Sequence, residues 1–140
     1  MENVAVIGLG LVGQFTIKFL LAAGCNVVGI DLDDRKVSFT EDNKKVLSLS
    51  RKSDGLKEKI LAFTDGFGVD KVIIAAAGQS NDPLEFATKI LRDRGRITDV
   101  GNVLLDVPRR EFYDNEFELN MSRSYGPGRY EKNYEDKINL

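Results

Sequence analysis

The sequence predicts an α/β fold in which a doubly wound, mostly parallel sheet of six strands carries helices on both faces. Short apolar runs that are typical of buried strands alternate with amphipathic stretches that are typical of helices. Through most of the chain a helix joins each strand to the next, and parallel neighbours need a crossover of this kind. We therefore expect the strand order 3-2-1-4-5-6.

The six expected strands are short apolar or alternating runs bounded by turn residues. They are residues 4–7, 26–30, 46–49, 71–76, 96–100 and 117–121. In the last of them Phe117, Leu119 and Met121 alternate with polar residues, which predicts that one face is wetter than the other.

Four helices are expected between the first five strands, and none between the fifth and the sixth. They should begin at Leu11, at Asp33 or Asp34, at Ser53 or Asp54, and at Asn81, and they should end near Ala23, Asp42, Phe63 and Gly95. Asn43 is expected to end the second helix in the left-handed conformation. Helical spacing predicts that the first helix turns four apolar residues toward the sheet, namely Val12, Phe15, Phe19 and Ala22.

Composition excludes several classes of function. The 140 residues carry 20 basic and 22 acidic side chains, so no charge excess indicates nucleic acid or a membrane surface as a partner. The apolar stretch at residues 19–23 is too short for a membrane span, and no signal peptide is evident, so we expect a cytoplasmic protein. Without histidine the chain has no histidine-based triad, no histidine general base and no zinc site of Cys and His. Cys25 is expected to be a buried structural thiol.

A glycine motif follows the first strand and opens the first helix. It reads Gly8-Leu9-Gly10-Leu11-Val12-Gly13, a G-x-G-x-x-G pattern in the context that dinucleotide binding requires. The first glycine permits a tight turn, the second lets the backbone approach a pyrophosphate, and the third lets the helix pack closely. The anion would then lie at the helix N-terminus, where free N–H groups and the helix dipole favour it. A tight turn without a ligand would use the same glycines.

Asp31 ends the second expected strand, 18 positions after Gly13. A carboxylate there can accept hydrogen bonds from the ribose hydroxyls of the adenosine, whereas Asp33 and Asp34 are better placed to cap the next helix. A 2′-phosphate about 4 Å from this carboxylate would be repelled by roughly 4 kcal/mol at an effective dielectric constant near 20. We therefore predict a Rossmann domain that binds NAD rather than NADP, and we count Leu32 among its candidate binding residues.

Two further segments are candidates because they end parallel strands. Ala76, Ala77 and Gly78 keep side chains small where a ligand would cross the carboxyl edge of the sheet, although simple close packing would explain them as well. Val100, Gly101 and Asn102 end the fifth strand and could support the nicotinamide end of the cofactor.

These features together resemble the cofactor domain of zinc-type medium-chain alcohol dehydrogenases. The resemblance covers most of residues 3–125 and includes Lys36, five positions after Asp31, and the segments 68–70 and 94–97. It implies that Asp31 and Lys36 hold the adenosine ribose, that the three glycines carry the pyrophosphate, and that residues 100–102 and 123–125 approach the nicotinamide. It identifies no catalytic residue here, and the Asn43-Lys44-Lys45 segment departs from the usual Leu-Gly-Ala turn.

The run at residues 122–130 resembles a bi-domain subgroup in which such a dehydrogenase half is fused to a second oxidoreductase half. The resemblance implies that the GroES-like catalytic domain of the parent protein is missing, and that this chain is an excised domain. We expect residues 1–125 to form the dinucleotide-binding domain and residues 126–140 a linker or tail. A homodimer through the sixth strand is also expected. The alternative is a regulatory nucleotide-sensing domain of the potassium-transport type, whose opening sequence is very similar.

Overall fold

A six-stranded sheet is the centre of the computed structural model, which describes residues 1–40 and 42–134. The strands are β1 (Asn3–Ile7), β2 (Asn26–Asp31), β3 (Val46–Ser50), β4 (Val69–Ile74), β5 (Leu91–Asp99) and β6 (Glu118–Met121). All neighbouring strands are parallel, and their order is β3-β2-β1-β4-β5-β6. The predicted doubly wound topology is therefore confirmed.

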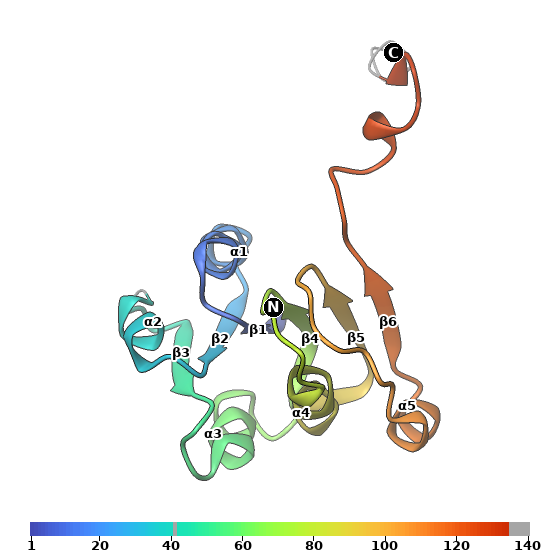
Figure 1. Ribbon diagram of the computed structural model, residues 1–140. Coiled ribbons are helices and arrows are strands. Elements are labelled where there is room, and N and C mark those ends of the chain that lie inside the picture. Colours follow the sequence, from blue (N-terminus) through green and yellow to red (C-terminus); the bar gives the residue numbers. More distant parts are fainter. Residues whose placement is uncertain (41, 135–140) are drawn as a thin grey trace.

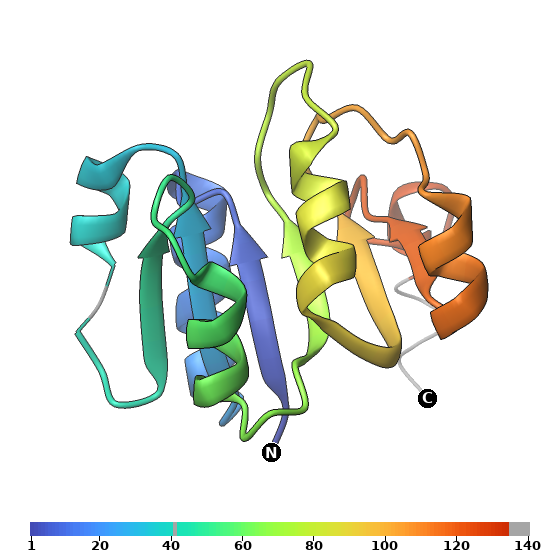
Figure 2. The ribbon, with the colours of Figure 1, turned by 90° about the horizontal axis from the view of Figure 1, so that it is seen from below.

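Helices cover both faces of this sheet. They are α1 (Leu11–Ala22), α2 (Asp34–Phe39), α3 (Leu56–Phe63), α4 (Asp82–Ile90), α5 (Arg109–Asn115) and the short 3-10 helix η1 (Pro127–Arg129). Figure 1 shows α1 on one face and α3, α4 and α5 on the other, and Figure 2 shows α3 and α4 in front of the strands. β1 lies between β2 and β4, so the chain changes direction across the sheet at this point, and such switch points form ligand crevices at the carboxyl ends of the strands.

The core has two layers because apolar side chains of the strands point alternately to the two faces. One layer packs under α3 and α4 and includes Val28, Val72 and Ile97, and the other packs under α1 and includes Val4 and Val6. Cys25 is buried in the second layer, in agreement with the expected structural thiol. No helix of the described residues is both long and apolar enough to cross a bilayer.

The prediction of the buried face of α1 was wrong. Val12 and Phe15 are each 53% exposed and Phe19 is 72% exposed, and Ala22 also lies at the surface. The buried positions are Gly13 and Ile17. The helix has apolar residues on two sides, and spacing alone did not distinguish the side that faces the sheet.

Three helix ends also differ from expectation. α2 ends at Phe39 rather than near Asp42, and Asn43 does not have a positive φ. Instead the Asn43 side chain accepts a hydrogen bond from the Lys45 N–H at 2.9 Å, so it forms a local turn. α3 begins after Gly55, which takes the left-handed conformation, rather than after Ser53 or Asp54.

The fourth helix stops well before Gly95. α4 ends at Ile90, and β5 begins at once with Leu91, so that Gly95 lies inside the strand. A Cβ atom at Gly95 would overlap the Leu91 side chain, which explains why a glycine occupies this position without ending a helix. The register of β4 and β5 shifts here as well, between Val69 and Lys71.

A fifth helix, α5, lies between β5 and β6 where none was expected. It begins after Pro108, and none of its residues is buried, so it lacks the apolar stripe that indicates a helix in a sequence. Its Phe112 ring packs edge-on against Phe117, with ring centroids 5.6 Å apart. Phe117 and Leu119 pack against the core as their alternation predicts, but Met121 is 61% exposed.

Candidate functional site

The glycine motif forms a tight loop between β1 and α1. Gly8 has a φ of 100°, and its N–H donates to the Ile30 carbonyl at 2.8 Å. A Cβ atom at Gly8 would lie 2.6 Å from the Ala76 nitrogen, and one at Gly13 would overlap the Gly8 carbonyl oxygen. These two glycines are therefore required by the packing of the loop.

Gly10 has a different environment. A Cβ atom there would meet no heavy atom of the described residues within 4 Å, so packing does not require glycine at this position. Gly10 is also the N-cap of α1, and no described side chain caps this helix end or places an acidic group in its first turn. The first N–H groups of α1 have no partner within the helix, and this end carries roughly half a positive charge through the helix dipole. Such an arrangement suits an anion.

Asp31 is held next to this loop at the end of β2. Its Oδ2 accepts the Leu9 N–H at 2.7 Å, and its Oδ1 accepts the Asp33 N–H at 2.8 Å. These two bonds fix the carboxylate at the edge of a cleft that Asp31 lines. Asp33 caps α2 instead, because its carboxylate accepts the Arg35 N–H at 3.0 Å. The Arg35 side-chain hydrogen bond also holds the pKa of Asp33 below its usual value.

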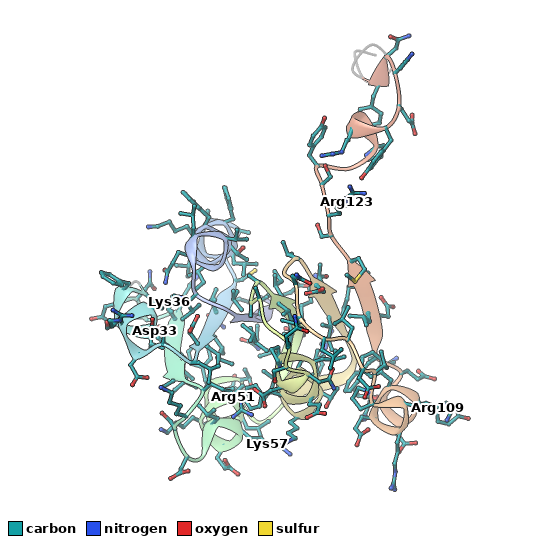
Figure 3. All side chains as sticks on the ribbon, in the orientation of Figure 1. Asp33, Lys36, Arg51, Lys57, Arg109 and Arg123 are labelled. Atoms are coloured by element: carbon teal, nitrogen blue, oxygen red, sulfur yellow. The ribbon has the colours of Figure 1, made fainter. Side chains whose placement is uncertain are left out.

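A cleft of about 520 Å³ lies at the carboxyl ends of the strands, at the switch point between β1 and β4. It brings together most of the predicted residues. Those that line it are Gly8, Gly10, Asp31, Leu32, Lys36, Ala76, Ala77 and Gly78. Figure 3 shows Asp33, Lys36 and Arg51 on the β2 and β3 side, with Arg109 and Arg123 away from them.

The other predicted residues do not line the cleft. Leu9 is buried behind the loop, and Leu11 and Val12 are exposed on α1 beside Gly13.

The segment Val100, Gly101 and Asn102 lies alongside the end of β4 but outside the cleft lining. The Asn102 N–H donates to the Ala76 carbonyl at 3.0 Å, and the Gly78 N–H donates to the Asn102 carbonyl at 2.9 Å. Residues 123–125 lie beyond β6, in the segment that extends away from the sheet in Figure 1. The implied approach of these segments to a nicotinamide stays a prediction.

Sequence reasoning missed one side of the cleft. On that side the missed lining residues are Arg51, Ser80, Asp82, Pro83, Phe86 and Val103, and the rest of the lining adds Ile7, Ile30, Ala75 and the helix cap Asp33. Arg51 follows β3 and bonds to Asp82, 31 positions later. No local motif joins two residues so far apart, so only the fold brings them together.

Asp99 is a buried carboxylate close to these strand ends. It is 2% exposed, and its Oδ1 has no hydrogen-bond partner within the described part of the chain. Burial raises the pKa of Asp99, and a hydrogen bond from the Gly101 backbone opposes this only in part. Asp99 does not line the cleft.

The glycine loop, the N-terminus of α1 and the Asp31 carboxylate form an arrangement that could hold a dinucleotide. Residues 1–40 and 42–134 contain no group of three or more His, Cys, Asp or Glu side chains that could hold a metal ion. A nicotinamide group bound here would supply the hydride chemistry itself.

Comparison with known proteins decides the family. The sequence profile of zinc-binding dehydrogenases matches residues 12–138, which is most of the chain. The chain belongs to the zinc-binding dehydrogenase family. A search of curated proteins finds no match.

Solved structures agree on the fold of this zinc-binding dehydrogenase domain. The D-arabinose dehydrogenase of Sulfolobus solfataricus is 22% identical with a TM-score of 0.71, over 87% of this chain and 38% of that one. A putative alcohol dehydrogenase from Sinorhizobium meliloti 1021 is 25% identical with a TM-score of 0.68, and the match covers 88% of this chain and 34% of that one. The nucleotide-binding subdomain of the enoylreductase domain of PpsC from Mycobacterium tuberculosis is 22% identical with a TM-score of 0.67. This match covers 87% of this chain and 69% of that one.

The chain therefore spans little more than a third of the dehydrogenases it resembles. The 140 residues correspond to one part of such a dehydrogenase, with the fold that the sequence predicted. The family match favours this interpretation over the regulatory potassium-transport type. Dehydrogenases of this family use a nicotinamide dinucleotide.

Proposed function

We propose that this domain binds NAD(H) in preference to NADP(H) and presents it to a catalytic domain elsewhere in the parent protein. The observation that carries the proposal is the Asp31 carboxylate, fixed by the N–H groups of Leu9 and Asp33 at the edge of the cleft. A carboxylate held in this way can accept hydrogen bonds from both ribose hydroxyls. It would also repel a 2′-phosphate by roughly 4 kcal/mol if the two charges were about 4 Å apart.

Titration of the purified chain tests this proposal. NADH should bind more tightly than NADPH, as followed by nicotinamide fluorescence or calorimetry. NADH at 100 times its Kd should also raise the free energy of unfolding by about 2.7 kcal/mol. Equal or tighter binding of NADPH would contradict the choice of cofactor, and no binding of either dinucleotide would contradict the function. We expect negligible alcohol oxidation by the chain alone.

The outer face of α1 supports the proposed second domain. Leu11 is 75% exposed, and with Phe15 and Phe19 it forms an apolar stripe along one side of the helix. No described element lies on that side of α1 in Figure 1. A stripe of this kind is typical of an interface. We propose that the catalytic domain of the parent protein covers it, and a parent protein in which Phe19 stayed exposed would contradict this.

A homodimer through β6 is a further proposal. Among the described residues β6 pairs only with β5, so its outer edge offers backbone groups with which a second copy can pair. Sedimentation that detects only monomers at high concentration would contradict it for this chain. The cytoplasmic location and the division at residue 125 stay predictions, and part of the expected tail lies outside the described residues.

A further inference from the structure

Arg51 makes an unusual set of contacts at the cleft. Its Nε donates to Asp82 Oδ2 at 2.9 Å, and its Nη2 donates to Asp82 Oδ1 at 2.7 Å. Its guanidinium carbon lies 4.3 Å from the centroid of the Phe86 ring. Phe86 is 4% exposed, so the ring is a buried support. The plane of the guanidinium group is therefore fixed by two different interactions.

Arg51 is also next to the proposed ribose site. Its backbone N–H donates to the Asp31 carbonyl at 2.8 Å, and Asp31 pairs with Ser50 in the sheet. The Arg51 side chain is 26% exposed and lines the same cleft as Asp31 and Leu32. The ribose at Asp31 joins the pyrophosphate on one side and the base on the other, and the glycine loop would hold the pyrophosphate. The base then falls toward the end of β3, where Arg51 lies.

The bonding of Arg51 suits a flat ring better than a phosphate. A phosphate site needs the N–H fork of an arginine, and here Asp82 already takes up the bidentate side of the fork and balances the charge. What stays available is the delocalised plane, which stacks well on aromatic rings. Phe86 covers one face of that plane, and the side chain borders the cleft.

We propose that Arg51, oriented by Asp82 and backed by Phe86, is the stacking platform for the adenine ring of the dinucleotide. This inference rests on the proposed function, because it assigns a residue to the base of the same ligand. Asp82 and Phe86 act through Arg51 and are positioning residues. The platform is assembled before the ligand binds, so little side-chain ordering opposes binding.

The test compares NAD with nicotinamide cytosine dinucleotide, which has the same sugars and pyrophosphate but a smaller, single-ring base. Arg51→Lys keeps the positive charge and a donor for Asp82 but removes the plane. We expect Arg51→Lys to weaken NAD binding by about five- to tenfold and the cytosine analogue far less, because stacking on a base is the interaction lost. Arg96→Lys is the matched control, since Arg96 also pairs with a carboxylate, Glu118, but lies outside the cleft lining.

Each other outcome is decisive. If Arg51→Lys binds NAD as tightly as the wild type does, Arg51 does not stack on the base. The same conclusion follows if its affinities for NAD and for the cytosine analogue fall equally. If Arg51→Lys loses NADPH but keeps NADH, its role is phosphate binding and the proposal is wrong. If the wild type binds neither dinucleotide, the proposed function fails and this inference fails with it. Thermal unfolding of each variant shows whether a change in binding reflects a change in folding.

Discussion

The Asp31 carboxylate accepts the backbone N–H of Leu9 at 2.7 Å. This bond connects the end of β2 to the glycine loop, so the group proposed to bind the ribose and the loop proposed to bind the pyrophosphate form one unit. Each part positions the other, so a change in either should alter the affinity for the dinucleotide.

Replacement of the carboxylate tests its role in the choice of cofactor. In Asp31→Asn the amide oxygen can keep the Leu9 N–H, but the amide nitrogen would then face the Asp33 N–H. We expect NADH binding to weaken about tenfold, or about 1.4 kcal/mol, as a charge-assisted bond is lost. The preference over NADPH should narrow because the repelling charge is gone. Titration of both cofactors measures this, with Asp34→Asn as the control on the exposed start of α2.

Gly10 offers a separation of binding from folding. Gly10→Val adds a side chain into open space, so we expect the free energy of unfolding to change by less than about 1 kcal/mol. The same side chain should block the approach of a pyrophosphate and lower NADH affinity by more than about tenfold. Gly8→Ala, which would press on Ala76, should instead destabilise the domain. Denaturant unfolding and NADH titration distinguish the two, and a Gly10→Val protein that binds normally would show that no ligand lies there.

Asp99 predicts a dependence of stability on pH. Burial raises its pKa in the folded state, so folding favours the protonated form. The contribution of Asp99 to stability is therefore full below the unfolded pKa and is lost as the pH rises through the raised, folded pKa. Asp99→Asn should stabilise the protein at pH 7 by about 1 kcal/mol, because the variant no longer buries a carboxylate charge whose Oδ1 lacks a partner among the described residues. Its advantage should disappear in acid.

Urea unfolding between pH 3 and pH 7 measures this difference. Asp114→Asn, at an exposed position on α5, is the control and should show no such advantage. A wild type that gains stability from Asp99 as the pH rises would contradict the sign.

The two apolar sides of α1 should respond differently to truncation. Ile17→Ala removes a buried side chain and should cost about 2–4 kcal/mol of unfolding free energy. Phe19→Ala should cost less than about 1 kcal/mol in this chain, because the ring is 72% exposed. In a longer protein that includes the proposed catalytic domain, Phe19→Ala should weaken the association of the two domains. Equal losses for both variants in the isolated chain would show that the assigned faces are wrong.

The strands and their order could be predicted because buried parallel strands are continuous apolar runs and the crossover rule leaves few topologies. The glycine loop and Asp31 were predictable for a similar reason, since each depends on short segments at the ends of strands. α5 was missed because it buries no residue and so has no apolar period. The buried face of α1 was predicted wrongly because Phe15 and Ile17 are both apolar. Only the position of the helix on the sheet determines which of the two is buried.

The Arg51 side of the cleft could not be predicted for a physical reason of another kind. The ion pair of Arg51 with Asp82 depends on the fold bringing the loop after β3 to the start of α4. Neither residue belongs to a spaced motif, and charged residues at strand and helix ends are usually solvated. Asp33 is a partial contrast, because its position before a helix made it one of two candidate caps together with Asp34, and the structure shows Asp33 as the cap.

The same ion pair joins the two βαβ halves of the sheet, since Arg51 belongs to the first half and Asp82 to the second. It connects the loop after β3 to the start of α4, and both residues line the cleft. If this ion pair keeps the cleft at a constant width, a dinucleotide should bind the isolated domain in a single fast step. The observed rate should then rise linearly with the dinucleotide concentration. If the proposed catalytic domain is joined to this one, a slow closing step would come from the motion of one domain against the other.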